Sequence, residues 1–103
     1  DSEMTSGIRL RKLLAEENPS IYGYDEELFA RVLFYDRPIA LSLDAIRVAR
    51  ESAAELLDRL NEAQWQRTGT HSESGAYGVE TWLEIYAAHC HDHARQIRVA
   101  LGN

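Results

Sequence analysis

Apolar residues recur every three or four positions along most of this chain, which is the spacing of one face of an α-helix. No stretch alternates apolar and polar residues as a strand would, and no segment repeats. The pattern predicts helices over residues 1–17, 25–36, 38–61 and 78–101. Because such helices bury their apolar faces against one another, we expect an all-α, antiparallel helix bundle made of the single domain 1–103.

Helix-starting and helix-breaking residues support these boundaries. Pro19 ends the first helix, because proline cannot continue the hydrogen-bond ladder. The acidic run 25–27 suits the start of the second helix, and Pro38 suits the first turn of the third. Residues 65–77 are rich in Gly, Ser and Thr, so they are expected to form a loop before the last helix.

The last predicted helix carries a cluster of histidines on one side. A helix turns by about 100° per residue, so side chains spaced three or four apart share a face. His89 and His93 therefore lie on the inward arc, whereas His91 points toward solvent. The same arc contains several neighbours of the pair: Trp82, Tyr86, Gln96, Ile97 and Ala100.

Two imidazoles one helical turn apart are close enough to bind one cation. The alternative is that His89 and His93 each bond to a neighbouring helix and serve only packing. No Glu follows the first histidine, so the sequence lacks the metalloprotease signature. Gln96 is either a hydrogen-bond partner of the pair or an ordinary polar residue at the edge. Cys90 is either a small core residue or a thiolate ligand.

Other candidate residues have simpler interpretations. Trp82 and Tyr86 either line a pocket beside the histidines or only pack in the core. The charged residues of the third helix form a solvated face, with Arg50 nearest its apolar edge. His71 is interpreted as an exposed loop residue, although a loop could bring it near a site.

Composition excludes several classes of function. The chain has 103 residues and a net charge of −6, with no basic run, so nucleic acid is not an expected partner. A single cysteine excludes an internal disulfide and makes the cytoplasm the expected compartment. No apolar run has the length of a membrane span, so no membrane association is expected.

The last helix resembles the signature of the DinB-like family, in which a histidine, three residues and a second histidine precede Gln-Ile. In this chain the matching residues are His89, His93, Gln96 and Ile97. The resemblance extends over essentially the whole chain in the same order. Its other matching segments are Asp1-Ser2-Glu3, Gly7-Ile8-Arg9, Leu13-Leu14-Ala15-Glu16, Asn18-Pro19, Tyr24-Asp25-Glu26-Glu27, Arg50, Leu60 to Trp65 with Arg67, and the His71-to-Gly75 loop.

The resemblance implies a four-helix bundle of the DinB/YfiT-like type that binds a divalent metal ion, zinc or nickel, through three histidines. His89 and His93 match the two late ligands. The early ligand precedes Asp-Ser-Glu in the family and has no counterpart in 1–103. The sequence is therefore expected to be short of the family's first helix. An uncovered apolar groove would follow, so we expect a homodimer.

The resemblance also implies a function, namely a metal-dependent enzyme that acts on a small molecule. Family members include metal-dependent hydrolases and transferases that use low-molecular-weight thiols. The residues themselves show no catalytic triad, paired acids or phosphate loop, so the metal is the only predicted chemical centre. They assign no catalytic side chain. Two alternatives stay open: a non-catalytic protein that binds metal or ligand, and a helical scaffold with structural histidines.

Overall fold

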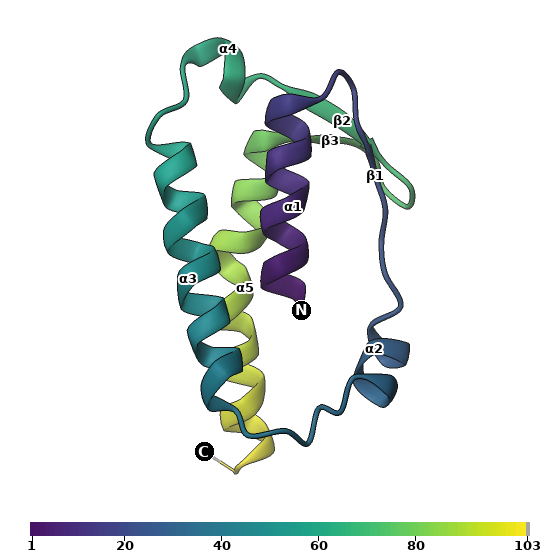
Figure 1. Cartoon of the computed structure of the whole chain (residues 1–103), viewed down its shortest axis with the longest axis vertical. Coiled ribbons are helices and arrows are strands. Elements are labelled where there is room, and N and C mark those ends of the chain that lie inside the picture. Colours follow the sequence, from purple (N-terminus) through teal and green to yellow (C-terminus); the bar gives the residue numbers. More distant parts are fainter. Residues whose placement is uncertain (103) are drawn as a thin grey trace.

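Three long helices form the body of the molecule: α1 (Ser2–Ala15), α3 (Ala40–Leu57) and α5 (Val79–Ala100) (Figure 1). The structure is a computed structural model that describes residues 1–102. Two short helices, α2 (Glu26–Val32) and α4 (Glu62–Trp65), lie in the connections. The prediction of an all-α protein is confirmed, because helices dominate the described residues.

The long helices do not all alternate in direction. In Figure 1, α1 and α3 both run upward and α5 runs downward between the same two ends. Helix α5 is therefore antiparallel to α1 and α3, while α1 and α3 are parallel. The reason is the long segment 16–39, which contains α2 and returns the chain along the whole length of the bundle before α3 begins.

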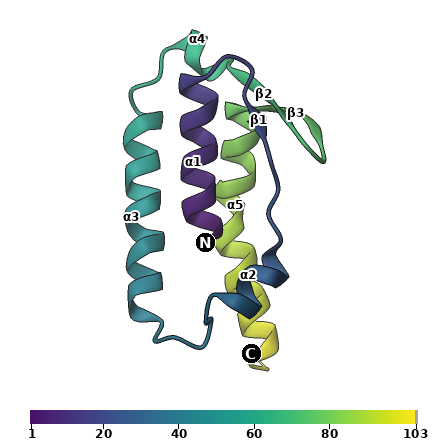
Figure 2. The same ribbon diagram turned by 45° about the vertical axis from the view of Figure 1, so that its right-hand side comes forward.

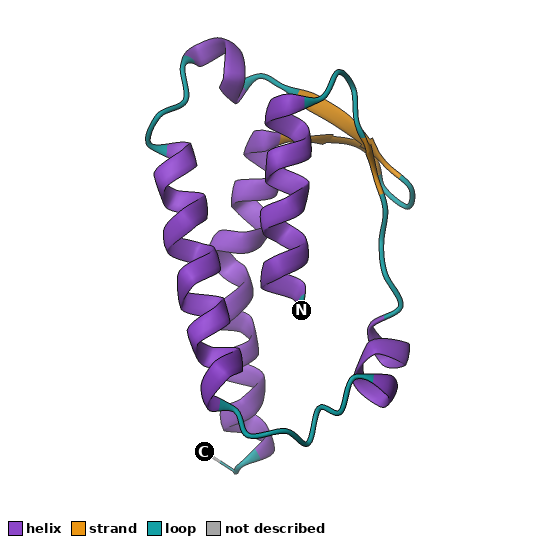
Figure 3. Cartoon of the chain, viewed as in Figure 1, coloured by secondary structure: helices purple, strands orange, loops and turns teal. Residues whose placement is uncertain are grey.

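A small sheet closes one end of the bundle, and here the expectation of no strands is wrong (Figure 3). Strand β1 (Ser20–Ile21) pairs in parallel with β2 (Thr68–His71), which pairs antiparallel with β3 (Gly75–Gly78). Strands of two to four residues are too short to show alternation in a sequence. A Cβ at Gly69 would lie 2.5 Å from the Pro19 carbonyl oxygen, so glycine is needed for this close pairing.

The helix boundaries differ from prediction where local turns intervene. Helix α2 begins after Asp25, whose carboxylate accepts a hydrogen bond from the Leu28 N–H, as expected for an acidic start. It ends at Val32 rather than near 36, and Phe34 then adopts a positive φ of 56°. Helix α3 starts at Ala40, two residues after Pro38. Most of the predicted loop 65–77 forms the β2–β3 hairpin, and α4 lies almost entirely before that loop, where no helix was predicted.

The buried core is concentrated near the sheet. It joins residues of α1, α3, α5 and the strands: Leu10, Leu13, Ile21, Ala53, Tyr77, Val79, Trp82 and Tyr86. Toward the other end, α5 extends past the first residue of α1 (Figures 1 and 2). In α5, the residues that the structure describes as buried are Val79, Trp82 and Tyr86, all in the half of the helix nearer the sheet.

Apolar side chains are also exposed along α1 and α3. Met4, Ile8 and Val48 each expose half or more of their surface, and they lie around a groove between these two helices. Such a surface is typical of one that packs against another element or chain, and the homodimer stays a prediction. Within residues 1–102, no helix has the combination of length and apolar character needed to cross a membrane.

Candidate metal centre

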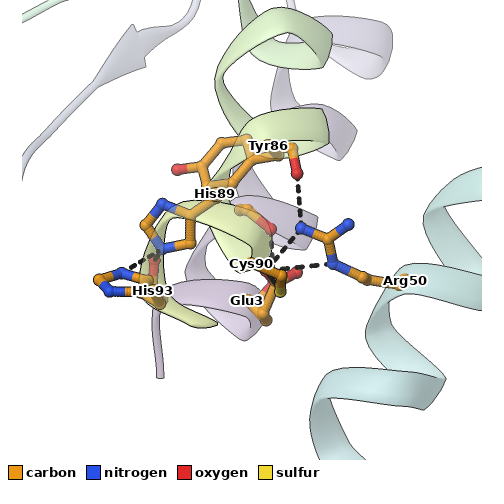
Figure 4. Close-up of polar contacts among 8 residues, drawn as sticks. Glu3, Arg50, Tyr86, His89, Cys90 and His93 are labelled. Atoms are coloured by element: carbon orange, nitrogen blue, oxygen red, sulfur yellow. Dashed lines mark hydrogen bonds and ion pairs between the residues drawn. The ribbon is translucent and has the colours of Figure 1, made fainter. Parts of the chain in front are cut away.

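His89 and His93 lie one turn apart on α5, and their rings face each other edge to face (Figure 4). The two Nε2 atoms are 3.2 Å apart. Two imidazole nitrogens bound tetrahedrally to one zinc ion, each at about 2.0–2.1 Å, are separated by about 3.3 Å. The spacing of the two nitrogens thus fits a shared divalent ion, and both belong to a residue type that zinc and nickel accept.

Hydrogen bonds at the other atoms orient the pair. Nδ1 of His93 lies 2.9 Å from Oε1 of Gln96, which can only accept, so Nδ1 carries the hydrogen. Nε2 of His93 then carries a lone pair, which lies at hydrogen-bond distance from Nε2 of His89 and which a bound ion would take instead. Orienting a ligand in this way is the role that outer hydrogen bonds play around metal-binding histidines. The hydroxyl of Ser2, at the start of α1, lies 3.2 Å from Nε2 of His89. The structure therefore places Gln96 as a partner of the pair.

The burial of the histidines differs partly from the helical-wheel prediction. His89 is half-buried and His91 is exposed, as expected. His93 is exposed rather than inward-facing, and Gln96 and Ile97 are exposed with it. Ser2, in the first turn of α1, lies beside His89, and His93 lies one turn further along α5. The pair lies at the end of the α1–α5 contact away from the sheet.

The aromatic residues before the histidines belong to the core. Trp82 is 4% exposed and its indole N–H donates to the Ser6 carbonyl at 2.8 Å. Tyr86 is 7% exposed, and its ring contacts the His89 ring with centroids 5.7 Å apart. Trp82 therefore serves packing. Tyr86 fits both the packing interpretation and the site interpretation, because it is buried in the core and its ring also lies against His89.

An arginine that the sequence interpretation did not single out lies on the same side of α5. Arg9 of α1 donates from Nη1 to the Tyr86 hydroxyl at 3.0 Å and from Nη2 to the Tyr22 carbonyl at 2.8 Å. The sequence feature that could have identified Arg9 is its spacing of seven residues from Ser2, which places both side chains on one face of a helix. We call Ser2, Arg9, Tyr86, His89 and His93 the histidine cluster.

A second polar cluster occupies the neighbouring face of α5 (Figure 4). The Glu3 carboxylate, 8% exposed, accepts from Nη2 of Arg50 at 3.1 Å, and Arg50 also donates to the Tyr86 carbonyl. The Cys90 thiol lies 3.4 Å from Oε1 of Glu3. We call Glu3, Arg50 and Cys90 the Glu3 cluster. Sequence reasoning identified Arg50 as the charged residue nearest the core but missed Glu3, which lies seven residues before buried Leu10 on the same helix face.

Cys90 behaves as a protonated thiol rather than as a metal ligand in this arrangement. Burial raises the pKa of its thiol, and the hydrogen bond to Glu3 raises the pKa further. Its sulfur contacts Glu3, on the side of α5 away from the two imidazole rings (Figure 4). The small-residue interpretation of Cys90 therefore fits the structure.

The remaining candidate ligands do not join the pair. His71 lies on β2, where its ring packs against Tyr77 with centroids 5.4 Å apart and its Nδ1 accepts from the Glu73 N–H. It is half-buried rather than exposed, because the predicted loop is part of the sheet. Across residues 1–102, no group of three or more His, Cys, Asp or Glu side chains is arranged to hold a metal ion.

Comparisons with known proteins agree with this arrangement of helices. The model of the DinB superfamily matches residues 3–97. A protein of Oceanobacillus iheyensis named "Putative metal-dependent hydrolase" is 37% identical over 97 residues, covering 94% of this chain and 56% of that protein. One of the same name from Halalkalibacterium halodurans is 31% identical over 101 residues, covering 98% of this chain and 59% of that protein.

A solved structure is similar as well. YfiT from Bacillus subtilis, described as "a probable metal-dependent hydrolase with an unusual four-helix bundle topology", superposes with a TM-score of 0.84 at 28% identity. The match covers 99% of this chain and 61% of YfiT. The chain thus spans less than two thirds of the length of these relatives. The family match over residues 3–97 shows that this chain belongs to the DinB superfamily.

Proposed function

We propose that His89 and His93 supply two ligands of a divalent metal ion, zinc or nickel, and that the protein is a metal-dependent enzyme of hydrolase type. The observation that carries the proposal is the 3.2 Å separation of the two Nε2 atoms on adjacent turns of α5. When bound, such an ion supplies Lewis acidity and lowers the pKa of a coordinated water or thiol. Two protein ligands leave further coordination positions to other donors and to substrate.

The residues around the pair have distinct tasks in this proposal. Gln96 holds His93 in the tautomer whose Nε2 is free to bind, and Ser2 places a hydroxyl beside Nε2 of His89. Tyr86 fixes the position of the His89 ring from the core side. These contacts support a site whose ligands are oriented before an ion binds, which reduces the entropy lost on binding.

Metal titration of three matched variants tests the site. His89→Ala and His93→Ala should abolish the gain in melting temperature on adding zinc or nickel. His91→Ala should keep that gain, because His91 is exposed and points to the opposite side of the same helix. An ion at about 100 times its dissociation constant stabilises the native state by about 2.7 kcal/mol, which is easily measured. No gain for the parent protein, or equal loss in all three variants, would exclude the site.

The reaction is tested separately on the metal-loaded protein. Small ester and amide substrates are followed with and without an added low-molecular-weight thiol. Turnover by water alone supports the hydrolase, as the names of the relatives favour. Turnover that requires the thiol supports a thiol S-transferase, since the same kind of ion activates thiols. Tight metal binding without any turnover supports a non-catalytic binding protein.

A further inference from the structure

Arg9 is a half-buried cation whose partners are all neutral. Its two recorded hydrogen bonds go to the Tyr86 hydroxyl and to the Tyr22 carbonyl, and it forms no ion pair among residues 1–102. Its Nε is buried and has no hydrogen-bond partner. A guanidinium has five N–H donors, and a cation removed from water is costly unless a negative charge lies nearby. Among residues 1–102, the charge of Arg9 therefore has neutral oxygens and solvent as partners but no anion.

A second buried donor lies next to Arg9. Tyr77, on β3, is 3% exposed, and its hydroxyl lies beside Tyr86 and Arg9 without forming a hydrogen bond of good geometry to either. Burial raises the pKa of Tyr77 to about 12, with Tyr86 and Arg9 among the neighbouring groups that influence it. The phenol therefore stays protonated at neutral pH and keeps a hydrogen to donate. An ordered water could bond to the Arg9 Nε–H and to the Tyr77 hydroxyl but could not neutralise the charge.

The position of this donor group relates it to the histidine pair. Tyr86 connects the two, because its hydroxyl accepts from Arg9 while its ring contacts the His89 ring. Ser2, on the same face of α1 as Arg9, contacts Nε2 of His89. Figure 4 shows the Tyr86 ring and both imidazole rings on the same side of α5. A small molecule held near the pair would therefore lie within reach of Arg9.

We propose that Arg9, with the hydroxyls of Tyr77 and Tyr86, forms a subsite for a carboxylate group of the substrate. The subsite rests on the proposed function, because it assigns a substrate class, small carboxylic acids and their derivatives, to the site at His89 and His93. A guanidinium matches the two oxygens of a carboxylate. One cation balances a monoanion, whereas a phosphate monoester carries nearly two charges and the protein's net charge is −6.

Titration of the metal-free protein with propionate tests the subsite independently of the metal. Proton–nitrogen NMR follows the Nε–H resonance of Arg9, and propionamide serves as the neutral molecule of the same shape. Propionate should shift this resonance in a saturable way, with a dissociation constant in the millimolar range, and propionamide should not. Arg9→Gln should weaken binding, followed on neighbouring backbone amides, by about tenfold or more, since a charge-assisted hydrogen bond is lost.

Two further variants keep the result interpretable. Tyr77→Phe should weaken propionate binding a few-fold without unfolding the protein. Arg47→Gln, which removes an exposed arginine of α3, should leave it unchanged. Because propionate binding is measured on the metal-free protein, failure of the metal site and failure of this subsite can be told apart. The proposal is overturned if the Arg9 resonance responds equally to propionamide, if Arg9→Gln binds propionate as well as the parent protein, if no saturable shift occurs, or if inorganic phosphate binds more tightly.

Discussion

The Glu3 cluster and the histidine cluster lie on neighbouring faces of the same stretch of α5, yet their polar groups are satisfied very differently. In the Glu3 cluster, the carboxylate accepts from Arg50 and lies beside the Cys90 thiol, while Arg50 also donates to the Tyr86 carbonyl. Each charge in it has a partner of opposite sign or a hydrogen bond. Because its polar groups are paired with one another, the Glu3 cluster has a structural role, which is to connect α1, α3 and α5.

The polar groups of the histidine cluster are less completely paired than those of the Glu3 cluster. Nε2 of His89 and Nε2 of His93 face each other, and Arg9 carries a charge that no carboxylate among residues 1–102 balances. Ser2 and Tyr86 add hydroxyls without adding charge. The cation of the Glu3 cluster has an anionic partner, whereas the cation of the histidine cluster has only neutral ones, which supports the proposed ligand binding. A cluster paired within itself has a structural role, and a cluster whose cation lacks an anion is the better candidate for binding one.

The largest expected effect on stability concerns the Glu3 cluster. Arg50→Met leaves the buried Glu3 carboxylate without its cation and should lower the free energy of unfolding by about 2 to 3 kcal/mol, measured by urea titration. Arg47→Met is the control, because its ion pair with Glu51 is 60% and 68% exposed and should contribute under about 1 kcal/mol. If Arg50→Met instead abolishes metal binding at unchanged stability, the structural role of this cluster is wrong.

The next effect concerns the pH dependence of stability that is due to Tyr77, which lies beside Arg9 of the histidine cluster. The folded pKa of Tyr77, about 12, lies above its ordinary value of 10.0. The unfolded phenol therefore ionises first as the pH rises, so stability is fully present below pH 10.0 and is lost toward pH 12. The loss should be on the order of 2 kcal/mol in urea unfolding, and Tyr77→Phe should remove that part of the pH dependence. An identical alkaline loss in Tyr77→Phe would show that Tyr77 is not its source.

The smallest expected effect separates affinity from stability within the histidine cluster. Gln96→Ala removes the acceptor that fixes the tautomer of His93 and should weaken zinc or nickel binding by about tenfold, measured by calorimetry. Gln96 is exposed, so the urea midpoint without metal should stay close to that of the parent protein. Unchanged metal affinity would show that Gln96 does not orient the site.

The sequence predicted the long helices and the position of the histidine pair because helical periodicity is a local property. His89 and His93 are one turn apart in any α-helix, and Gln96 is necessarily close to His93. The capping carboxylate of Asp25 and the stop near Pro19 are equally local. The sheet escaped prediction because its strands have only two to four residues and because β1 pairs with β2 across fifty positions of sequence.

The sequence by itself determined that this protein is helical and that two imidazoles share one face of its last helix. Only the tertiary structure decided what surrounds them. The meeting of Glu3 with Arg50, and of Arg9 with Tyr77 and Tyr86, depends on how α1 packs between its neighbours. The contact of Ser2 with His89, 87 positions apart in the chain, depends on the same packing. Contacts between residues far apart in the chain are set by packing of the whole core, and no local pattern encodes them.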